Sequence, residues 1–517
     1  MAKVVTAREA ADLIKDNSTL LIQGLICTSV PEACIQALGA RYRETQTPKN
    51  LNLMFAGIGD GNEAGVNALA QDGLVGEIQC THLGTAPKMA AMVNENKFPA
   101  FIMPQGVYAQ LIKAIGGNKP GVITHVGLGT YADPRVEGCK ANQAAIDSGK
   151  EIVEVVNFDG QDYLRYLPRK IDYCFIKGTS VDEKGNLSIE KEAMQFDQFE
   201  YANAVHNCGG KVIAQVERVV ESGTLNPHSV VIPGYIIDYV VIGKGQEQAQ
   251  CIADPAYHPE WCGEARIPLA AVEPLPLNVK KVCGRRTAYL LKPGFHVNLG
   301  IGVPETVSAV AAEEGVSDQL TFSVECGIFG GVPLGGLQIC CDHNPDAIIS
   351  HVQTFDIYDG GGCDLAVLGA AEMDEEGNVN VSKFNGRMVG PGGFINITSS
   401  SQNVAFVGTF TAGKSKYEVG GGKLTIVQEG KFKKFKKQVE QVTFSGRQAA
   451  ATGKNIYYIT ERAVFKLTKE GVELIEIAPG VDLEKDVLAL MDFRPIMKDV
   501  KLMDARLFME EPMGLII

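Results

Sequence analysis

The 517-residue sequence is poor in several features that mark particular classes of protein. It contains a single tryptophan, and no window approaches 18 uninterrupted apolar residues. A membrane-spanning helix needs about 20 such residues, so no membrane partner is predicted. Basic residues are also in the minority, with 48 Lys and Arg against 61 Asp and Glu, for a formal net charge of −13. This acidic balance argues against a nucleic acid as the main partner.

Paired cysteine spacings are missing too. The 13 cysteines are scattered, and no pair has the C-x-x-C spacing. The first residues carry charges throughout and lack the apolar core of a secretory signal peptide. In a chain of this length, we therefore expect reduced, mostly buried thiols and a cytoplasmic protein.

Several familiar catalytic signatures are absent. The sequence has no G-x-S-x-G nucleophile elbow, no H-E-x-x-H or other close pair of histidines, and no complete Walker A sequence. A serine hydrolase site, a metal site and a phosphate-binding P-loop are therefore not predicted. Glycine is plentiful instead, at 57 residues, which is typical of an α/β enzyme with many tight loops.

What the sequence does contain is an internal repeat. Residues 171–189 resemble residues 363–381 at a constant separation of 192, and at the same separation residues 211–215 fall on 403–407. Near the ends, Ile232-Pro233-Gly234 is matched with Ala478-Pro479-Gly480. Several unlike positions agree in one register, which favours two related halves over chance similarity.

The repeat predicts an α/β fold with two open halves, each a mostly parallel sheet covered by helices. The predicted halves are residues 1–243 and 278–517, joined by a proline-containing linker over residues 244–277. Ligands of open α/β sheets bind beyond the carboxyl ends of the strands, so we expect the active site there, in the cleft between the halves.

Two strand ends in the second half carry candidate chemistry. A predicted strand over residues 295–299 runs into a glycine-containing loop, and a helix is predicted from Pro304 to about Glu314. Such a loop and helix start favour an anionic group, although a purely structural turn fits as well. Glu305 takes the place of the third glycine of G-x-G-x-x-G, so a dinucleotide site is not favoured.

The next predicted strand, residues 320–324, delivers Glu325 into a glycine-rich turn. Charged side chains are rarely buried without a partner or a purpose. An ion pair or a helix cap remains an alternative to catalysis. With other nucleophiles missing, a carboxylate acting as covalent nucleophile is the remaining catalytic option, and at a pKa of about 4.3 it is already ionised at neutral pH.

Several segments together resemble the class I coenzyme A transferases, in particular the single-chain acetate/propionate CoA-transferases with fused α and β parts. The segments are residues 103–106 (MPQG), 298–304 (NLGIGVP), 323–327 (SVECG), 389–394 (VGPGGF) and 460–465 (TERAVF). The resemblance spans the chain and implies that the halves are an α-like and a β-like part. It also implies that CoA moves between short-chain carboxylic acids through an acyl-glutamyl anhydride and a γ-glutamyl-CoA thioester.

The resemblance also assigns the site. Glu325 is the expected nucleophile, and Gln105 and Gly106 are expected near the acyl group. The residues expected to bind CoA and to stabilise the oxyanion are Gly300, Ile301, Gly302, Val303, Pro304, Gly390, Gly392 and Gly393. No metal or cofactor is expected, because CoA is a substrate, and the family suggests a homo-oligomer, specifically a tetramer. Cys326 departs from the usual Ser, Thr or Asn and is expected to pack.

Two other activities remain as alternatives. An acyl-CoA hydrolase on the same scaffold would release free CoA without an acceptor acid. A non-catalytic ligand-binding module would bind its ligand even without the Glu325 carboxylate.

Overall fold

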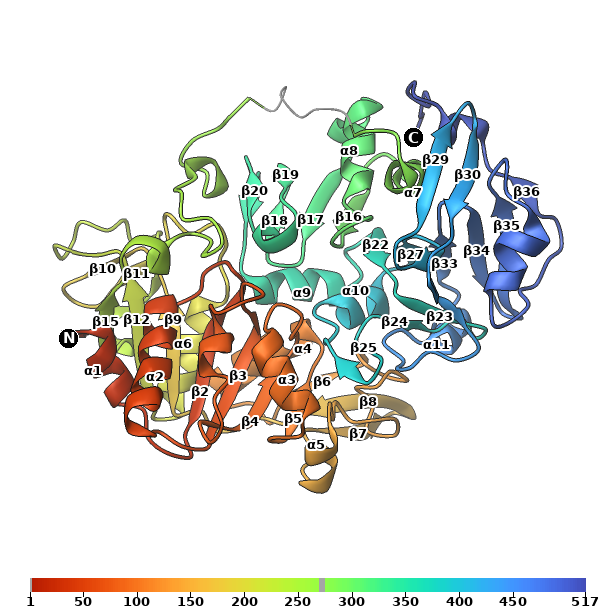
Figure 1. The fold of residues 1–517 in the computed structure, drawn as a ribbon. Coiled ribbons are helices and arrows are strands. Elements are labelled where there is room, and N and C mark those ends of the chain that lie inside the picture. Colours follow the sequence, from red (N-terminus) through yellow and green to blue (C-terminus); the bar gives the residue numbers. More distant parts are fainter. Residues whose placement is uncertain (1, 269–274) are drawn as a thin grey trace. The chain divides into compact units, whose positions relative to one another are not determined.

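The computed structural model describes residues 2–268 and 275–517 and has an α/β fold (Figure 1). The chain forms two compact units that are not continuous in sequence. Unit 1 holds residues 2–267, 325–356 and 386–396, and unit 2 holds the remaining described residues. The predicted halves and linker stay a prediction, and residues 269–274 of that linker lie outside the described residues.

Unit 1 is built on an eight-stranded sheet in which every neighbouring pair is parallel. Its strands are, in spatial order, β1 (Lys3–Val5), β15 (Tyr239–Ile242), β12 (Lys211–Val216), β9 (Tyr173–Lys177), β2 (Thr19–Ile26), β3 (Leu51–Ile58), β4 (Val75–Cys80) and β5 (Ala100–Ile102). All residues of β2 are buried, as expected for a central strand covered on both faces. The sheet thus confirms the predicted mostly parallel α/β class.

The helices of unit 1 connect these strands (Figure 1). They are α1 (Ala7–Asp12), α2 (Glu32–Thr45), α3 (Pro87–Asn94), α4 (Gln105–Gly116), α5 (Gln143–Asp147) and α6 (Gln198–Asn207). Helix α1 packs on α2, and α4 packs on α6. Two smaller sheets complete the chain up to residue 267: β6 (Val122–Thr124), β8 (Gln161–Tyr166) and β7 (Val153–Phe158), and β13 (Arg218–Val220), β10 (Ser180–Asp182), β11 (Leu187–Ser188) and β14 (Val230–Ile232).

Two later segments also belong to unit 1. The first contains the antiparallel pairs β18 (Ile328–Phe329) with β21 (Ala347–Ile348) and β19 (Val332–Pro333) with β20 (Asp342–His343), followed by the start of α9 (His351–Asp359). The second contains β26 (Arg387–Met388) and the start of α10 (Phe394–Ser400).

Unit 2 has a mixed sheet. Its strands are β17 (Thr321–Val324), β16 (His296–Leu299), β22 (Leu365–Gly369), β27 (Asn403–Val407), β33 (Asn455–Ile459), β34 (Ala463–Thr468), β35 (Gly471–Ile477) and β36 (Lys501–Leu502). Neighbours are parallel from β17 to β33, and β34 is antiparallel to both of its neighbours. Val297, Val367 and Ala405 contribute buried side chains to the core cluster of this unit.

Helices α7 (Val279–Ala288) and α8 (Thr306–Glu313) pack against each other in unit 2, and α11 (Gly446–Ala451) precedes β33. Helix α8 begins two residues later than the predicted Pro304, because Glu305 is its cap residue. Short strands complete the unit: β23 (Glu372–Asp374), β24 (Val379–Asn380), β25 (Lys383–Phe384), β28 (Thr411–Ala412), β29 (Lys416–Gly420), β30 (Lys423–Gln428), β31 (Phe432–Lys433) and β32 (Phe435–Lys436).

The repeat of 192 residues is confirmed. Strands β9 and β22, β10 and β23, and β12 and β27 each begin 192 residues apart. The turns after β10 and β23 also match in their hydrogen bonds: the Asn186 side chain donates to Asp182 Oδ2 at 2.9 Å, and the Asn378 side chain donates to Asp374 Oδ2 at 3.0 Å. Both units therefore contain the same strand-turn-strand element.

The predicted match between Gly234 and Gly480 is wrong. In unit 1 the backbone N–H of Gly234 donates to Asn186 Oδ1 at 2.9 Å, and in unit 2 the equivalent bond to Asn378 Oδ1 comes from Gly446 at 2.9 Å. Gly446 is therefore the counterpart of Gly234. The sequence match failed because Pro-Gly pairs mark turns of many kinds.

The thiols are as expected. All 13 cysteines are free, and all are buried except the half-buried Cys208 and Cys262. Within residues 2–268 and 275–517, no helix combines the length and apolar character that crossing a membrane requires.

Candidate functional site

Glu325 lies in the tight turn that joins β17 to β18, as the first residue of this segment to belong to unit 1. The turn requires the glycine that follows two residues later. Gly327 has φ +101°, and a Cβ there would lie 2.2 Å from the carbonyl oxygen of Ile349. No other residue fits this position without moving the backbone. The E-x-G pattern therefore has a local steric cause.

The glycine-rich segment 389–393 is bound to the carboxyl ends of two neighbouring strands, β4 and β5. The N–H of Gly392 donates to the carbonyl oxygen of Thr81 at 3.2 Å, and the N–H of Gln105 donates to the carbonyl oxygen of Gly392 at 3.0 Å. Gly390 has φ +90°, and a Cβ there would lie 2.5 Å from the Thr81 carbonyl oxygen. These backbones approach each other closely only because glycine has no side chain.

Glu325 lies against the same segment. A Cβ on Gly393 would be 3.2 Å from Glu325 Cδ, and a Cβ on Gly392 would be 3.7 Å from Glu325 Oε1 and 3.5 Å from Gln105 Oε1. The backbone N–H of Gly393 donates to the Glu325 carboxylate. The structure thus gathers Glu325, Gln105, Gly392 and Gly393 around one small space.

The half-buried Glu325 carboxyl does not have the pKa of an exposed glutamate. Burial raises its pKa, because the charged form loses hydration. Protonated His351 and the hydrogen bond from Gly393 lower the pKa of Glu325 without cancelling the effect of burial. The ordinary pKa that the sequence argument assumed is therefore too low, and Glu325 binds its proton more readily than an exposed glutamate.

A buried polar chain that sequence reasoning missed lies behind Gln105. The Gln105 side-chain nitrogen lies 2.9 Å from His351 Nε2, and His351 Nδ1 lies 2.7 Å from Asp197 Oδ2. No spacing pattern could have revealed this chain, because Asp197 and His351 are 154 residues apart.

Comparison with known proteins identifies the family. A family model described as coenzyme A transferase matches residues 4–243. The caffeate CoA-transferase of Acetobacterium woodii is 44% identical over 522 residues, which cover 100% of this chain and 99% of that protein. The chain belongs to the coenzyme A transferases. It is therefore an enzyme, and the resemblance to the single-chain class I transferases is confirmed.

Two further comparisons agree with this coenzyme A transferase assignment. The acetate CoA-transferase YdiF of Escherichia coli K12 is 40% identical, and the match covers 99% of this chain and 96% of that protein. A crystal structure of the acyl-CoA transferase YdiF from E. coli O157:H7, in a thioester complex with CoA, is similar with a TM-score of 0.95. It is 40% identical, and the match covers 100% of this chain and 98% of that one.

Gly106, the second residue expected near the acyl group of this coenzyme A transferase, is tightly packed. Its N–H donates to Asn396 Oδ1 at 3.0 Å, and a Cβ on it would lie 2.4 Å from Phe355 Cδ1. The ring of Phe355 therefore fills the space beside Gly106. A contact between Gly106 and the acyl group stays a prediction.

The predicted CoA-binding residues 300–304 belong to unit 2 of the transferase, in the loop between β16 and α8. The N–H of Gly300 donates to the carbonyl oxygen of Val367 at 2.8 Å, which fixes the start of the loop on β22. Gly302 has φ +90°, and the Ile301 side chain is exposed. The role of this loop and of Gly390 in binding CoA stays a prediction.

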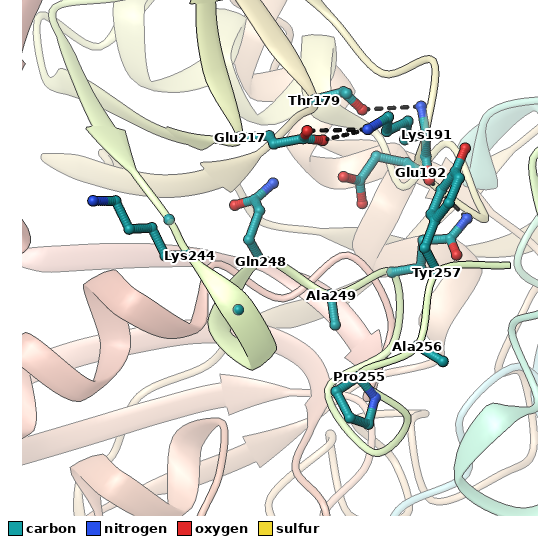
Figure 2. Close-up of a pocket in the computed structure, with 13 residues that line it drawn as sticks. Thr179, Lys191, Glu192, Glu217, Lys244, Gln248, Ala249, Pro255, Ala256 and Tyr257 are labelled. Carbon is teal, nitrogen blue, oxygen red and sulfur yellow. Dashed lines mark hydrogen bonds and ion pairs between the residues drawn. The ribbon is translucent and has the colours of Figure 1, made fainter. Parts of the chain in front are cut away.

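A separate cavity in unit 1, of about 400 Å³, is lined by residues that include Lys191, Glu192, Lys244 and Tyr257 (Figure 2). Its charged groups are mostly paired. Lys191 Nζ lies 3.0 Å from both carboxylate oxygens of Glu217. Because these charges neutralise one another and none of the predicted site residues lines the cavity, it is not the candidate reaction site of the coenzyme A transferase.

No group of three or more His, Cys, Asp and Glu side chains in the described ranges is placed to hold a metal ion. Cys326, next to Glu325, is buried and hydrogen-bonded to the Cys340 thiol, in agreement with the expected packing role.

Proposed function

We propose that the chain transfers CoA between a short-chain acyl-CoA and a carboxylic acid such as acetate, propionate or butyrate, with Glu325 as the covalent nucleophile. The observation that carries this proposal is the placement of the Glu325 carboxylate against the glycine segment that includes Gly393. The E. coli relative crystallised as a thioester complex with CoA supports it, because such a complex has the chemistry of the second intermediate below.

The first half of the reaction loads CoA onto the enzyme. A Glu325 oxygen attacks the thioester carbonyl carbon, the C–S bond breaks, and an acyl-glutamyl anhydride and CoA thiolate form. The thiolate then attacks Glu325 Cδ and expels the first acid as its carboxylate, which leaves a γ-glutamyl-CoA thioester. This is nucleophilic catalysis with two covalent intermediates and ping-pong kinetics.

The second half reverses these steps with a new acid. The incoming carboxylate attacks Glu325 Cδ and releases CoA thiolate, which then attacks the acyl carbonyl of the new anhydride. The products are a new acyl-CoA and the free Glu325 carboxylate. One thioester replaces another, so the exchange needs no ATP, and CoA serves as a substrate without a further cofactor or metal.

Each attack produces an oxyanion. Preorganised N–H donors stabilise such charge, and one donor contributes about 10²–10³-fold in rate. The N–H of Gly393 already donates to the Glu325 carboxylate and supplies one such donor when Cδ is attacked. A homo-oligomer remains a prediction from the family.

Mass spectrometry of trapped enzyme tests the proposal. After incubation with acetyl-CoA alone, the peptide that contains Glu325 should carry the mass of CoA, and borohydride reduction of the adduct should block further turnover. An adduct on another residue, or none, would contradict the mechanism.

The 44% identity to a caffeate CoA-transferase favours a second substrate class, an aromatic unsaturated acid. A panel of acceptor acids against acetyl-CoA, ranked by kcat/KM, separates the two classes. We expect acetate, propionate or butyrate to exceed caffeate, and the reverse order would assign the aromatic class.

The raised pKa of Glu325 predicts the pH dependence of the first half-reaction. Only the carboxylate attacks, and burial makes it take up a proton at a higher pH than an exposed glutamate. As the pH falls, the rate of adduct formation should therefore decline at a pH above the ordinary pKa of about 4.3. Single-turnover rates with acetyl-CoA as a function of pH check this, and a decline only below that value would contradict it.

Replacing Gly393 by alanine should displace the nucleophile. The new methyl group would lie 3.2 Å from Glu325 Cδ and 3.0 Å from Phe355 Cζ, so one of them must move. A misplacement of about 1 Å costs about 100-fold in rate, and we expect a loss of that order in kcat. Gly420→Ala is the control, because a Cβ there meets no described atom within 4 Å. Equal kcat values for both variants would contradict the prediction.

A further inference from the structure

The polar chain Gln105–His351–Asp197 is almost completely buried: each of the three residues is 1% exposed. Burying three polar side chains is costly unless their hydrogen bonds are satisfied, and here each one binds the next. Gln105, at one end, has its side-chain oxygen at the space beside Gly392, which Glu325 Oε1 also borders. This row of hydrogen-bonded side chains therefore connects the buried Asp197 carboxylate to the candidate reaction site.

The direction of each hydrogen bond follows from the atoms involved. Asp197 Oδ2 accepts from Nδ1–H of His351, and in the neutral form of the imidazole this leaves the lone pair on Nε2. Of the two ends of the Gln105 amide, only the nitrogen can donate to that lone pair, and it lies 2.9 Å from Nε2. Asp197 thus fixes the tautomer of His351, and His351 fixes which end of the Gln105 amide faces it.

The oxygen end of the Gln105 amide has a longer contact. Its Oε1 accepts from the Thr81 hydroxyl at 3.4 Å. The same hydroxyl lies closer to the Ala56 carbonyl oxygen, at 3.1 Å, so its single proton is shared between these two acceptors. The contact with His351 is therefore the shorter of the two that orient the amide, and the second N–H of Gln105 donates to no residue in the described part of the chain.

The surroundings hold the Asp197–His351 pair still. The ring of Phe196 lies 4.3 Å from that of His351, centroid to centroid, and Phe355 meets it edge-on at 5.0 Å. Asp197 Oδ1 also accepts from the N–H of Val352 at 2.8 Å. Asp197 has φ +55°, a left-handed conformation that costs energy for a residue other than glycine and that persists at sites under functional constraint.

We propose that Asp197 and His351 are positioning residues of the transferase reaction, which hold Gln105 so that its free N–H serves the carbonyl group reacting at Glu325. This inference rests on the proposed function. Neither residue touches substrate: Asp197 sets the tautomer of His351, His351 accepts one N–H of Gln105, and the second N–H is left to donate to the developing oxyanion.

Asp197→Asn is the sharpest test, because it keeps the size of the side chain. An amide N–H facing Nδ1 makes that nitrogen the acceptor, so Nε2 becomes the protonated one and can no longer accept from Gln105. Since the Gln105 amide must then turn, we expect kcat to fall by about 10²–10³-fold, the loss typical of one oriented donor, with KM for acetyl-CoA little changed.

A double-mutant comparison separates positioning from mere stability. Gln105→Leu should lower kcat by about as much as Asp197→Asn, and the double variant should lose little more, because both changes remove the same donor. Asp182→Asn is the matched control. Asp182 is also buried and caps a turn in unit 1, so its loss should affect stability and leave kcat unchanged. His351→Phe, which keeps a ring between Phe196 and Phe355, replaces Asp197→Asn if the latter fails to fold.

The outcomes are distinguishable. If the wild-type enzyme forms no adduct on Glu325, the proposed function fails. If the adduct forms but Asp197→Asn or His351→Phe keeps the wild-type kcat, or if the losses from Asp197→Asn and Gln105→Leu multiply, the positioning role alone is overturned.

Discussion

Replacing Glu325 by alanine is expected to lower kcat for CoA exchange by about 10⁴–10⁶-fold, the range seen when a covalent nucleophile is removed. Both covalent intermediates form at this one carboxylate, so neither half of the transfer reaction can proceed without it. Glu325→Gln should fail equally, since an amide does not form the anhydride. Exchange of labelled acetate into acetyl-CoA measures the loss, and circular dichroism verifies the fold.

A carboxylate from the second cavity provides the control for this experiment. Glu217 faces the cavity of Figure 2 and pairs with Lys191, so Glu217→Gln should exchange acetate at the wild-type rate. If Glu325→Ala exchanged label at a rate near that of the wild type, the nucleophile would lie elsewhere. If Glu217→Gln lost the activity instead, the cavity of Figure 2 would be the reaction site.

The same assay separates the two alternative activities that the sequence allows. A hydrolase on this scaffold would release CoA from acetyl-CoA in the absence of any acid. A binding module would exchange no label and would keep its ligand in Glu325→Ala. We expect neither result, because the chain belongs to a family of transferases with full-length relatives at 40% and 44% identity.

The sequence predicted those parts of the fold that depend on neighbouring residues. The 192-residue repeat identified the β9–β10 and β22–β23 elements because an Asp-x-x-x-Asn turn is determined by bonds within five residues. Gly327, two residues after Glu325, was likewise recognised in the sequence, because its φ of +101° disfavours every residue other than glycine. Short-range geometry of this kind leaves a pattern in the sequence.

Side chains that meet only through the fold left no such pattern. Asp197 precedes α6 and His351 opens α9, and both look like ordinary polar residues at helix starts. The contact of His351 with Gln105 depends on the carboxyl end of β5, and that of Asp197 with His351 on the packing of α6 against α4. The polar chain therefore could be found only once the three segments were placed together.

One segment that carried the family resemblance has a structural role. Arg462, in the sequence TERAVF, is fully buried in unit 2. Its guanidinium binds Glu461 Oε1 at 2.7 Å and Glu429 Oε2 at 2.6 Å, and it lies 5.1 Å from the centre of the Phe410 ring. Resemblance alone does not separate such an ion-pair network from a reaction site.

Replacing Arg462 by methionine is expected to lower the free energy of unfolding by about 3–5 kcal/mol, the cost of breaking a buried ion pair by removing one partner. The change leaves Glu461 completely buried, and within the described residues the backbone N–H of Phe410 is its remaining donor. Urea unfolding followed by far-ultraviolet circular dichroism measures the loss.

Adding Glu461→Gln to Arg462→Met should restore part of this stability, since a neutral amide oxygen still accepts from Phe410 without a buried charge. The matched control is Arg494→Met. Arg494 is 68% exposed and lies 3.7 Å from Glu484, so its loss should change stability by no more than about 0.5 kcal/mol. Equal losses of unfolding free energy in Arg462→Met and Arg494→Met would show that burial of the charge is not what makes Arg462 important. Recovery of stability in the double variant would identify the unpaired Glu461 carboxylate as the source of the instability.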